Sequence, residues 1–554
     1  MKNIFFFCAV FIFLFENAYS QVVEEWVARY NGEGNGGDTP RTIAVGYSSN
    51  VYVSGDSYGI GSNFDYAAVK YNSDGNEQWV ARYNGPGNHE DRPYSMTIDD
   101  SGNVYLTGTS LGSGTGYDYA TVKYNSIGLE QWVARYNGPD NEQDRANAIT
   151  VDGSGNVYVT GQSYANATDL DFTTVKYNPL GTQSWEARYN GPADTADVGY
   201  SIVVDESGNV YVAGYSVGSN GSYDFATLKY NSAGQQLWIE RYNGPGNSED
   251  RVFSMAIDDS GYIYVTGRSY GDTTDADWAT IKYNSDGVVQ WTVRYNGSIN
   301  SLDSPNKIIV DDSFNVYVTG SGSYNSGDGE DFTTIKYNSS GEQQWVSTYN
   351  GPHNFRDVAN SMDVDGMGNV YVTGRTWVTQ LDYDFATIKY NSSGQEQWVA
   401  IYNGPDNGDD WASSITTDVS GNAYVTGWSE GLGTGYDFTT IKYSSTTGVK
   451  TLSNDFPTNY SLLQNYPNPF NPRTKIKFTI PNVGTQNTVS VRLKVYDILG
   501  NEIATLLDEE KAPGTYEVEY TVAQDSSPEI TSGVYFYQLK TEGYVKTKKM
   551  LLLK

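Results

Sequence analysis

Cysteine and histidine are almost absent from this chain of 554 residues. The one cysteine, Cys8, lies in a hydrophobic run at the start, and the two histidines are His89 and His353. The mature chain therefore has no thiol for catalysis or metal ligation, and a histidine-rich metal centre is excluded. It also has no disulfide, which an exported protein of this size can do without because it buries a large core.

Long apolar runs are also missing, apart from Ile4 to Phe15, which follows Lys2. About 12 apolar residues are too few to span a bilayer. Ala18-Tyr19-Ser20 offers small residues at the two positions that a signal peptidase would read. We therefore interpret residues 1–20 as a signal peptide cleaved before Gln21, and expect no transmembrane segment in the mature chain.

Positive charge is scarce, with 35 Lys and Arg against 66 Asp and Glu and a formal charge of -31. Residues 455–554 hold 11 acidic and 11 basic side chains, so the whole excess belongs to the residues before them. Phosphate binding needs clustered Lys and Arg, so we expect no nucleic-acid partner. A soluble acidic surface with no binding role is the other interpretation of this charge.

What the chain does have is a repeat. The phrase EQWVARYNGP at Glu77 to Pro86 returns in recognisable form, so that eight copies can be counted. Successive copies are 53 residues apart, with one interval of 54, which is typical of a repeat architecture. The tryptophans of the eight copies are Trp26, Trp79, Trp132, Trp185, Trp238, Trp291, Trp345 and Trp398.

Each repeat predicts four short strands bounded by Gly, Asn, Asp or Ser. In the second repeat they are Tyr94 to Ile98, Asn103 to Thr107, Asp118 to Tyr124 and Gln131 to Tyr136. The third strand has apolar groups on both faces, as expected of a strand between neighbouring sheets. Four antiparallel strands repeated around an axis make a β-propeller, whereas the coils of a linear β-solenoid, the alternative, are usually much shorter.

The repeat region begins and ends partway through a repeat, and this predicts how a ring of repeats would close. The chain starts with an isolated fourth strand, Glu25 to Tyr30, and the last repeat stops near Tyr443 after three strands. The sequence therefore predicts an all-β fold with an eight-bladed β-propeller at residues 21–444. Its N-terminal strand would complete the last blade, leaving no unpaired edge.

The run D-x-S-G-N-V-Y-V-T-G, followed by D-F-A-T-I-K-Y-N, resembles the bacterial β-propeller repeats called SBBP, over about residues 22–444. The resemblance implies the propeller fold. It implies no single activity, because the same fold serves many functions.

Two sets of loops vary between repeats, those after the second strand and those between blades. In an antiparallel meander both sets emerge at the same end, while the other end carries short Asp, Asn and Gly turns. Variation at one end predicts a binding face, although aromatic side chains there could instead cover the edges of neighbouring blades. The candidate residues for stacking on sugar or peptide are Tyr58, Tyr164, Tyr270, Tyr324, Trp377, Trp411 and Trp428.

Eight aspartates open the third strands in register, from Asp65 to Asp437. Glycoside hydrolysis needs two carboxyls in different environments, so this symmetry favours a recurring structural hydrogen bond instead. Calcium could bind the Asp-rich loops, but the D-x-[DN]-x-[DN]-G series is missing. We therefore expect no catalytic residue and no cofactor.

The 53-residue repeat is no longer present after Gly448. Residues 445–460 read as a linker, and residues 461–554 alternate apolar and polar side chains, which predicts a small Ig-like β-sandwich. The phrases of this last segment closely resemble the type A C-terminal sorting domain of the type IX (Por) secretion system. The residues that carry the match include Asn465, Tyr466, Pro467, Asn468, Pro469, Phe470, Asn471, Pro472, Gly533, Tyr535, Lys548 and Lys549.

The resemblance implies that the type IX secretion machinery is a partner and that the protein is secreted or displayed at the outer cell surface. An ordinary adhesive sandwich domain is the alternative. We expect a non-catalytic binding or scaffold protein with an extracellular carbohydrate or protein ligand. The alternatives are a polysaccharide-degrading enzyme with its site at the channel mouth, and a structural surface or adhesion component.

Overall fold

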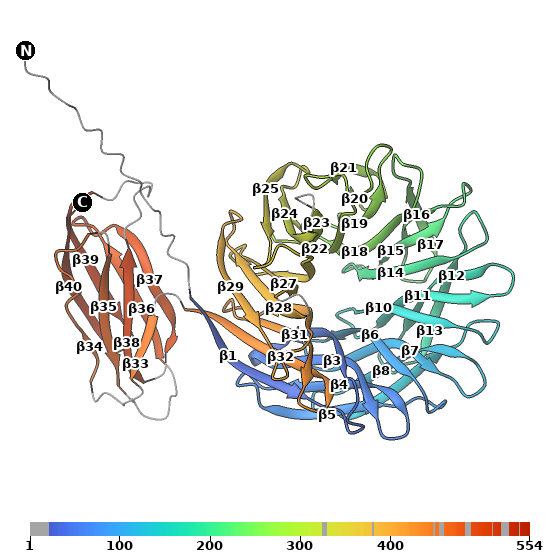
Figure 1. Ribbon diagram of the computed structural model, residues 1–554, viewed down its shortest axis with the longest axis horizontal. Coiled ribbons are helices and arrows are strands. Elements are labelled where there is room, and N and C mark those ends of the chain that lie inside the picture. Colours follow the sequence, from blue (N-terminus) through green and yellow to red (C-terminus); the bar gives the residue numbers. More distant parts are fainter. Residues whose placement is uncertain are drawn as a thin grey trace, which may run out of the picture. The chain divides into compact units, whose positions relative to one another are not determined.

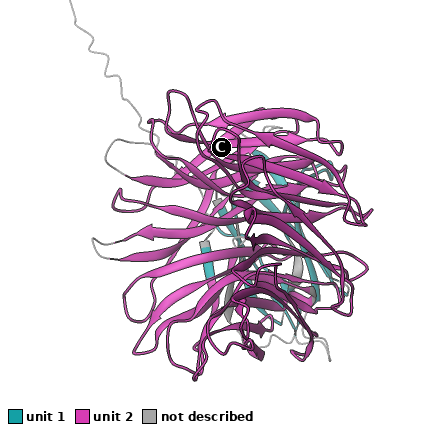
Figure 2. Cartoon of the chain, turned by 90° about the vertical axis from the view of Figure 1, so that its right-hand side faces the viewer, with its two compact units in different colours: residues 1–23, 445–554 teal, residues 24–444 magenta. Residues whose placement is uncertain are grey.

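The computed structural model describes residues 21–323, 329–378, 382–446, 449–453, 459–471, 473–481, 489–511, 513–521, 531–541 and 543–553. The expected signal peptide, Tyr324 and Pro472 lie outside these residues. The chain forms two compact units, residues 24–444 and residues 445–554 with residues 1–23 (Figure 2). In the described part, regular structure is β apart from one short turn of 3-10 helix, which confirms the all-β prediction.

In the first unit the described strands form eight four-stranded sheets. We number these sheets one to eight along the chain. Their first strands are β2 (Thr39–Val45), β6 (Asp91–Ile98), β10 (Asp144–Val151), β14 (Asp197–Val204), β18 (Asp250–Ile257), β22 (Ser304–Val310), β26 (Val358–Val364) and β30 (Asp410–Thr417). Their second strands are β3 (Val51–Gly59), β7 (Val104–Leu111), β11 (Val157–Ala165), β15 (Val210–Val217), β19 (Ile263–Tyr270), β23 (Val316–Ser323), β27 (Val370–Trp377) and β31 (Ala423–Gly431).

The remaining two strands of each sheet follow in the same order. The third strands are β4 (Asn63–Tyr71), β8 (Tyr117–Tyr124), β12 (Asp169–Tyr177), β16 (Tyr223–Tyr230), β20 (Ala276–Tyr283), β24 (Glu330–Tyr337), β28 (Tyr383–Tyr390) and β32 (Gly435–Thr446). The fourth strands are β5 (Glu77–Tyr83), β9 (Glu130–Tyr136), β13 (Gln183–Tyr189), β17 (Gln236–Tyr242), β21 (Val289–Tyr295), β25 (Gln343–Tyr349), β29 (Glu396–Tyr402) and, for the eighth sheet, β1 (Gln21–Tyr30).

The eight sheets lie around a common centre, with their first strands innermost (Figure 1). Each first strand contacts the first strand of the next sheet, and β30 contacts β2. The ring of sheets is therefore closed.

Strand β1 lies in the last sheet, in the order β1-β32-β31-β30. Its Arg29 donates hydrogen bonds to Ser429 Oγ at 2.8 Å and to Asp437 Oδ2 at 3.0 Å. The ring of Tyr30 packs edge-on against Phe438, with 5.4 Å between centroids. The two ends of the repeat region are thus joined in one sheet, as the phase of the repeat predicts.

The second and third strands of each sheet are buried on both faces. Tyr105 and Tyr119 in the second sheet are 0% exposed, and they share one apolar cluster with Val157 and Val175 of the third sheet. The same kind of cluster joins Phe438 of the last sheet to the first sheet. Every sheet is therefore packed between two others.

The tryptophan of the repeated phrase fastens each sheet to the next. The indole N–H of Trp79 donates to the carbonyl of Ser126, at 3.2 Å, in the turn between β8 and β9. At the equivalent turn of the first sheet, Gly75 has a φ of +79°, and a Cβ there would lie 2.6 Å from the Trp26 ring. The same indole bond recurs at Trp26, Trp132, Trp185, Trp238, Trp291 and Trp345.

The observed strands are longer than the predicted ones at the end that carries the variable loops. Strand β6 begins at Asp91 rather than Tyr94, and β7 runs to Leu111 rather than Thr107. The buried Asp91 accepts the backbone N–H of Gly85 at 2.5 Å, so the start of the strand is anchored by its own side chain. A bulge between Pro93 and Ser95 accommodates this extension.

The second unit contains two four-stranded sheets, in the orders β33-β38-β35-β34 and β37-β36-β39-β40. One buried cluster includes Phe478 of the first sheet and Leu493 and Tyr537 of the second, so the sheets share a core. Their strands are β33 (Val449–Ser453), β34 (Ser461–Leu462), β35 (Arg473–Ile480), β36 (Val489–Tyr496), β37 (Glu502–Lys511), β38 (Gly514–Thr521), β39 (Gly533–Lys540) and β40 (Val545–Leu552). Part of the expected linker is therefore strand β33, which pairs with β38.

Deleting Val22 to Asn31 should destabilise the ring out of proportion to its length, because the last sheet loses its fourth strand. We expect the melting temperature of the purified protein to fall by roughly 10 °C or more. The variant Arg29→Gln, which keeps the strand and loses only the side-chain bonds, should cost less. A deletion variant that melts at the wild-type temperature would show that β1 does not hold the ring closed.

Candidate binding face

Both sets of variable loops lie at the same end of the sheets, which we call the variable face. The between-sheet loop residues Gly87 and Gly246 donate backbone hydrogen bonds to Leu111 and Tyr270, at the ends of second strands, both at 3.0 Å. In the neighbouring loops, Asn88 Nδ2 donates to the carbonyl of Gly61 at 3.0 Å. These bonds tie the two loop sets together.

Three of the predicted aromatic residues come together in the seventh and eighth sheets. Trp411 and Trp428 are cross-strand neighbours on β30 and β31, with ring centroids 5.7 Å apart. Trp428 also contacts Tyr436 of β32 at 4.3 Å. Trp377 contacts Tyr383 at 4.5 Å, from the paired strands β27 and β28. Each of the three tryptophans is half-buried, so part of each ring remains accessible.

Arg375 joins these two aromatic groups. Its guanidinium carbon lies 3.3 Å from the centroid of the Trp411 ring and 4.8 Å from that of Tyr383. The side chain is only 9% exposed, and its Nε is buried without a hydrogen-bond partner among the described residues. Burial lowers the pKa of Arg375 to about 10, although nearby Tyr383 opposes the shift. Arg375 therefore stays protonated at neutral pH.

The other predicted aromatics are spread around the ring. Tyr58 is 37% exposed and packs edge-on against Phe64 of its own sheet, with centroids 5.5 Å apart. Tyr164 and Tyr270 are half-buried, and their backbone N–H groups donate to the buried Asp144 and Asp250, the first residues of β10 and β18. The variable face is thus not one continuous aromatic surface. One aromatic cluster lies in sheets seven and eight, and another lies in sheet four, where Tyr215 contacts Tyr200 at 5.6 Å and Tyr223 at 4.8 Å.

A second group on this face was not predicted. The ring of Tyr94 lies between two arginines, with the guanidinium carbons of Arg41 and Arg145 at 5.1 and 4.0 Å from its centroid. The buried Asp56 accepts from Arg41 at 2.7 Å and Arg92 at 3.3 Å. Arginines outside the phrase WVARY were the signal in the sequence that could have revealed this group.

The aspartates that open the third strands have a structural role in six sheets. Arg82 donates to Asp65 Oδ2 at 2.9 Å, to Ser57 Oγ at 2.6 Å and to the hydroxyl of Tyr30, in the neighbouring sheet, at 2.9 Å. The same arginine-aspartate pair recurs with Arg29, Arg135, Arg188, Arg241 and Arg294. The predicted recurring hydrogen bond is confirmed in these sheets.

Sheets six and seven lack this arginine, because Thr348 and Ile401 stand in its place. In the seventh sheet Asp384 is 2% exposed, and its Oδ1 has no hydrogen-bond partner among the described residues. Burial, with the nearby Asp410 and Asp382, raises the pKa of Asp384 to about 7. Loss of the arginine therefore leaves a carboxyl that is partly protonated at neutral pH.

The innermost strands also depart from the repeat in the sixth sheet. Lys307 on β22 is exposed, but neighbouring strands crowd it, so desolvation lowers its pKa while the negative charge of Asp363 raises it. Asp363 in turn accepts the backbone N–H of Thr417 at 2.6 Å and its hydroxyl at 2.8 Å. The equivalents of Lys307 are small residues, namely Thr42, Ser95, Ala148, Ser201, Ser254, Ser361 and Ser414.

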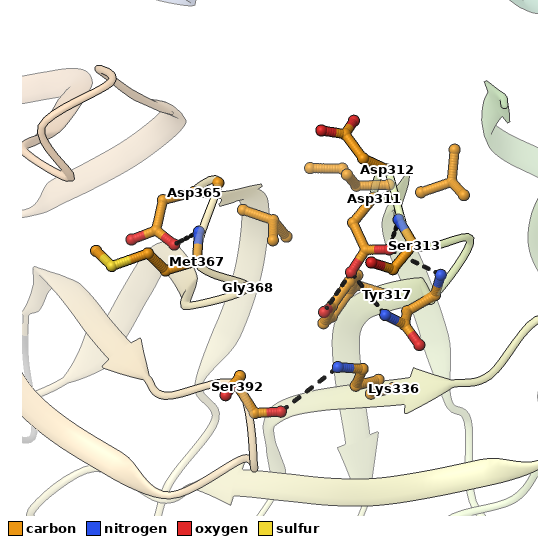
Figure 3. Close-up of a pocket in the computed structure, with 14 residues that line it drawn as sticks. Asp311, Asp312, Ser313, Tyr317, Lys336, Asp365, Met367, Gly368 and Ser392 are labelled. Carbon is orange, nitrogen blue, oxygen red and sulfur yellow. Dashed lines mark hydrogen bonds between the residues drawn. The ribbon is translucent and has the colours of Figure 1, made fainter. Parts of the chain in front are cut away.

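A cleft of about 390 Å³ lies at the opposite end of the sheets, between the turns that begin at Asp311 and Asp365 (Figure 3). Asp311 accepts from the backbone N–H of Ser313 and the hydroxyl of Tyr317, both at 2.9 Å. Lys336 donates to the carbonyl of Ser392 across the cleft at 3.5 Å. The turn bonds recur around Asp99, Asp152, Asp205 and Asp418, so we interpret the cleft as a feature of the repeated turns.

The described residues contain no group of three or more His, Asp or Glu side chains placed to hold a metal ion. His89 and His353 are exposed in loops between sheets.

The sorting-motif residues help hold the second unit together. The hydroxyl of Tyr537 accepts the backbone N–H of Asn465, whose side chain donates to Thr474 Oγ1 at 2.9 Å. Asn468 Oδ1 accepts from Leu551 N, and Phe470, 2% exposed, pairs by backbone bonds with the end of β40. Gly533 begins β39, Tyr535 is buried on it, and Lys548 and Lys549 lie on β40.

Each of the two units matches the model of a known protein family. Five segments match the family model of the SBBP β-propeller repeat, at residues 78–114, 131–166, 187–221, 238–272 and 397–433. Residues 464–553 match the model of the secretion system C-terminal sorting domain. The chain carries SBBP propeller repeats and a type IX sorting domain. The sorting domain indicates export across the outer membrane, so this SBBP-repeat protein is secreted or lies at the cell surface.

None of the five matched segments includes residues 273–396 of the SBBP-repeat protein. That stretch contains Lys307, Thr348, Arg375 and Asp384. Ile401, the other position at which the repeat arginine is missing, lies inside the matched segment 397–433. No helix in the described part is long and apolar enough to cross a membrane.

No curated protein matches the SBBP-repeat protein. Among solved structures, PorZ, a surface component of the type-IX secretion system of Porphyromonas gingivalis, is 13% identical with a TM-score of 0.31, covering 94% of this chain and 74% of PorZ. A fungal alcohol oxidase of the AA5 family is 13% identical, with a TM-score of 0.40 and coverage of 97% and 100%. Drosophila Plexin A is 9% identical, with a TM-score of 0.36 and coverage of 63% and 84%. Similarities this weak carry no argument about function.

Restoring the missing arginine in the seventh sheet should stabilise the SBBP-repeat protein more at high pH than at low pH. The folded protein keeps on Asp384 a proton that the unfolded chain releases above its ordinary pKa of 3.8. Stability from this group is therefore full below about pH 4 and lost as the pH rises through about 7. Ile401→Arg should lower the pKa of Asp384. In urea unfolding, the variant's free energy of unfolding should exceed that of the wild type by about 1–3 kcal/mol more at pH 8 than at pH 5.

The control for this prediction is the double variant Ile401→Arg with Asp384→Asn. If the arginine acts through the carboxylate, the pH-dependent part of the gain should vanish in the double variant. An equal gain at both pH values, or one that persists without Asp384, would contradict the assignment.

Proposed function

We propose that this secreted or surface-displayed protein is a non-catalytic binding protein that engages an extracellular carbohydrate or protein through the variable face. In this proposal the eight sheets are the blades of an eight-bladed propeller, and the second unit is an Ig-like sandwich that serves export. The observation that carries the proposal is the cluster of Trp411, Trp428 and Tyr436 on that face.

These three side chains differ from the aromatic residues of the repeat in what they do. The repeated tryptophans donate to a neighbouring turn, as Trp79 does. Trp411 and Trp428 have no such counterpart in most repeats, where their positions hold residues such as Thr39 and Thr109. Large amphipathic rings that leave part of their surface in water, at an end of a rigid scaffold, suit sugar or peptide stacking.

The non-catalytic part of the proposal rests on how carboxyls are used at this face. The buried aspartates at the start of the first strands accept backbone N–H groups, as Asp91 does from Gly85. Those of the third strands pair with arginine in six sheets. Glycoside hydrolysis would need a pair of accessible carboxyls in different environments. Turnover of polysaccharide by the purified protein would therefore favour the enzymatic alternative.

Replacing both Trp411 and Trp428 by alanine should weaken ligand binding by at least tenfold, about 1.4 kcal/mol, because the stacking surface is lost. A glycan array and a pull-down from extracellular material would identify the ligand, and calorimetry would measure its affinity. The matched control is the pair Ile127→Ala and Leu180→Ala, which removes apolar side chains 67% and 80% exposed at the opposite end. Binding that survives in the tryptophan variant, or no ligand in either screen, would refute the proposal.

Deleting residues 461–554 should leave the protein in the periplasm, because the segment recognised for outer-membrane export is then missing. Cell fractionation with surface proteolysis would locate the repeat region. As a control, the same residues fused to a periplasmic carrier should bring that carrier to the surface. Normal surface display of the truncated protein would overturn the role given to the second unit.

A further inference from the structure

The arginines of the repeat region fall into two groups by the residues that they contact. Residues 21–446 contain thirteen, and six of them form the pairs with third-strand aspartates described above. The other seven all lie at the variable face, on first-strand starts, second-strand ends or the loop before a first strand. They are Arg41, Arg92, Arg145, Arg251, Arg268, Arg356 and Arg375. The six paired arginines stand next to the last residue of their fourth strands, so a strongly acidic region places all its arginines toward this one end.

Four of these seven arginines have a carboxylate partner. Arg41 and Arg92 share Asp56, Arg251 contacts Glu249 at 3.2 Å, and Arg356 contacts Glu330 at 3.1 Å. Arg145, Arg268 and Arg375 form no ion pair or hydrogen bond with any described residue, although the chain has 66 acidic side chains. These three lie on sheets three, five and seven, each separated from the next by one sheet.

Arg375 is the most constrained of the three. Its flat face lies against the indole of Trp411 at 3.3 Å, and Tyr383 lies 4.8 Å away. Stacking uses the face of a guanidinium and leaves its in-plane N–H donors for a planar acceptor such as a carboxylate or a sulfate oxygen. A buried cation with unused donors carries a desolvation cost that such an anion would offset.

The neighbouring rings indicate what kind of anion fits. From Trp411 the aromatic contacts continue to Trp428 at 5.7 Å and Tyr436 at 4.3 Å, so several rings extend from the arginine. The apolar face of a sugar can stack on such rings while one acidic substituent reaches Arg375. Single charges spaced along a polysaccharide match Arg145, Arg268 and Arg375 on alternate sheets, whereas the region's charge of -31 opposes a dense polyanion such as nucleic acid.

We propose that the variable face binds an anionic polysaccharide, one that carries uronate or sulfate groups, and that Arg375 receives an acidic substituent of a sugar stacked beside it. This inference rests on the proposed function and names its ligand class. Arg375, Trp411 and Trp428 form the central subsite, and Arg268 and Arg145 receive further charges along the chain.

The test compares neutral, uronate-containing and sulfated polysaccharides for binding to the full-length secreted protein by calorimetry and on a glycan array. We expect the anionic polymers to bind at least tenfold more tightly than neutral ones. Arg375→Gln should reduce that preference at least tenfold. Arg92→Gln, which removes an arginine paired with Asp56 and Glu90 on the same face but in sheet two, should change it less than twofold.

A wild-type measurement covers the case in which Arg375→Gln fails to fold. Free glucuronate or sulfate should then compete with the polysaccharide more strongly than chloride at the same ionic strength. Equal binding of neutral and anionic polymers would overturn this inference and leave the proposed function standing. Equal losses in the two arginine variants, or tighter binding of DNA or an acidic protein, would also overturn it. Absence of any ligand would refute the proposed function itself.

Discussion

Each sheet of the repeat region is apolar on both faces, and this constraint governs the rest of the architecture. Tyr105 and Tyr119 are 0% exposed because the sheets on either side cover them. A terminal sheet would expose one such face to water, at about 25 cal/mol per Å² of apolar surface. An open row of sheets would therefore be unstable at both ends, and packing the last sheet against the first removes both exposed faces. The shifted phase of the chain, with β1 in the last sheet, lets backbone hydrogen bonds lock that closure.

The residues that recur from repeat to repeat make contacts that hold one sheet to the next. The Trp79 indole donates to a turn of the following sheet, and Arg82 reaches both Asp65 in its own sheet and Tyr30 in the preceding one. The turns at the opposite end are satisfied by their own aspartates, as Asp99 is by Asn103 and Tyr105. These demands leave the variable face as the end where residues can change without opening the ring.

The sequence was sufficient for the all-β class and the repeated four-stranded sheets because both of its signals are local or periodic. Spacing of Trp26 and its copies predicts the repeat, and alternation within each repeat predicts the strands, although β6 and β7 extend further than their apolar cores. Contacts on the variable face could not be predicted in the same way. Trp411 and Arg375 belong to different repeats and meet only because sheet eight packs on sheet seven. Aromatic residues chosen by loop position alone, such as Tyr58, therefore included some that pack within their own sheet.

Sheets six and seven depart from the repeat at positions that stabilise the other sheets. Sheets six and seven have lost the arginine that pairs with the third-strand aspartate, at Thr348 and Ile401, which leaves Asp384 with a raised pKa and no compensating cation. Sheet seven also carries Arg375, which forms no ion pair with any described residue, beside Trp411. In sheet seven an arginine thus stands at the end of the second strand, against the aromatic cluster, and none stands at the fourth-strand position that six sheets use for structure.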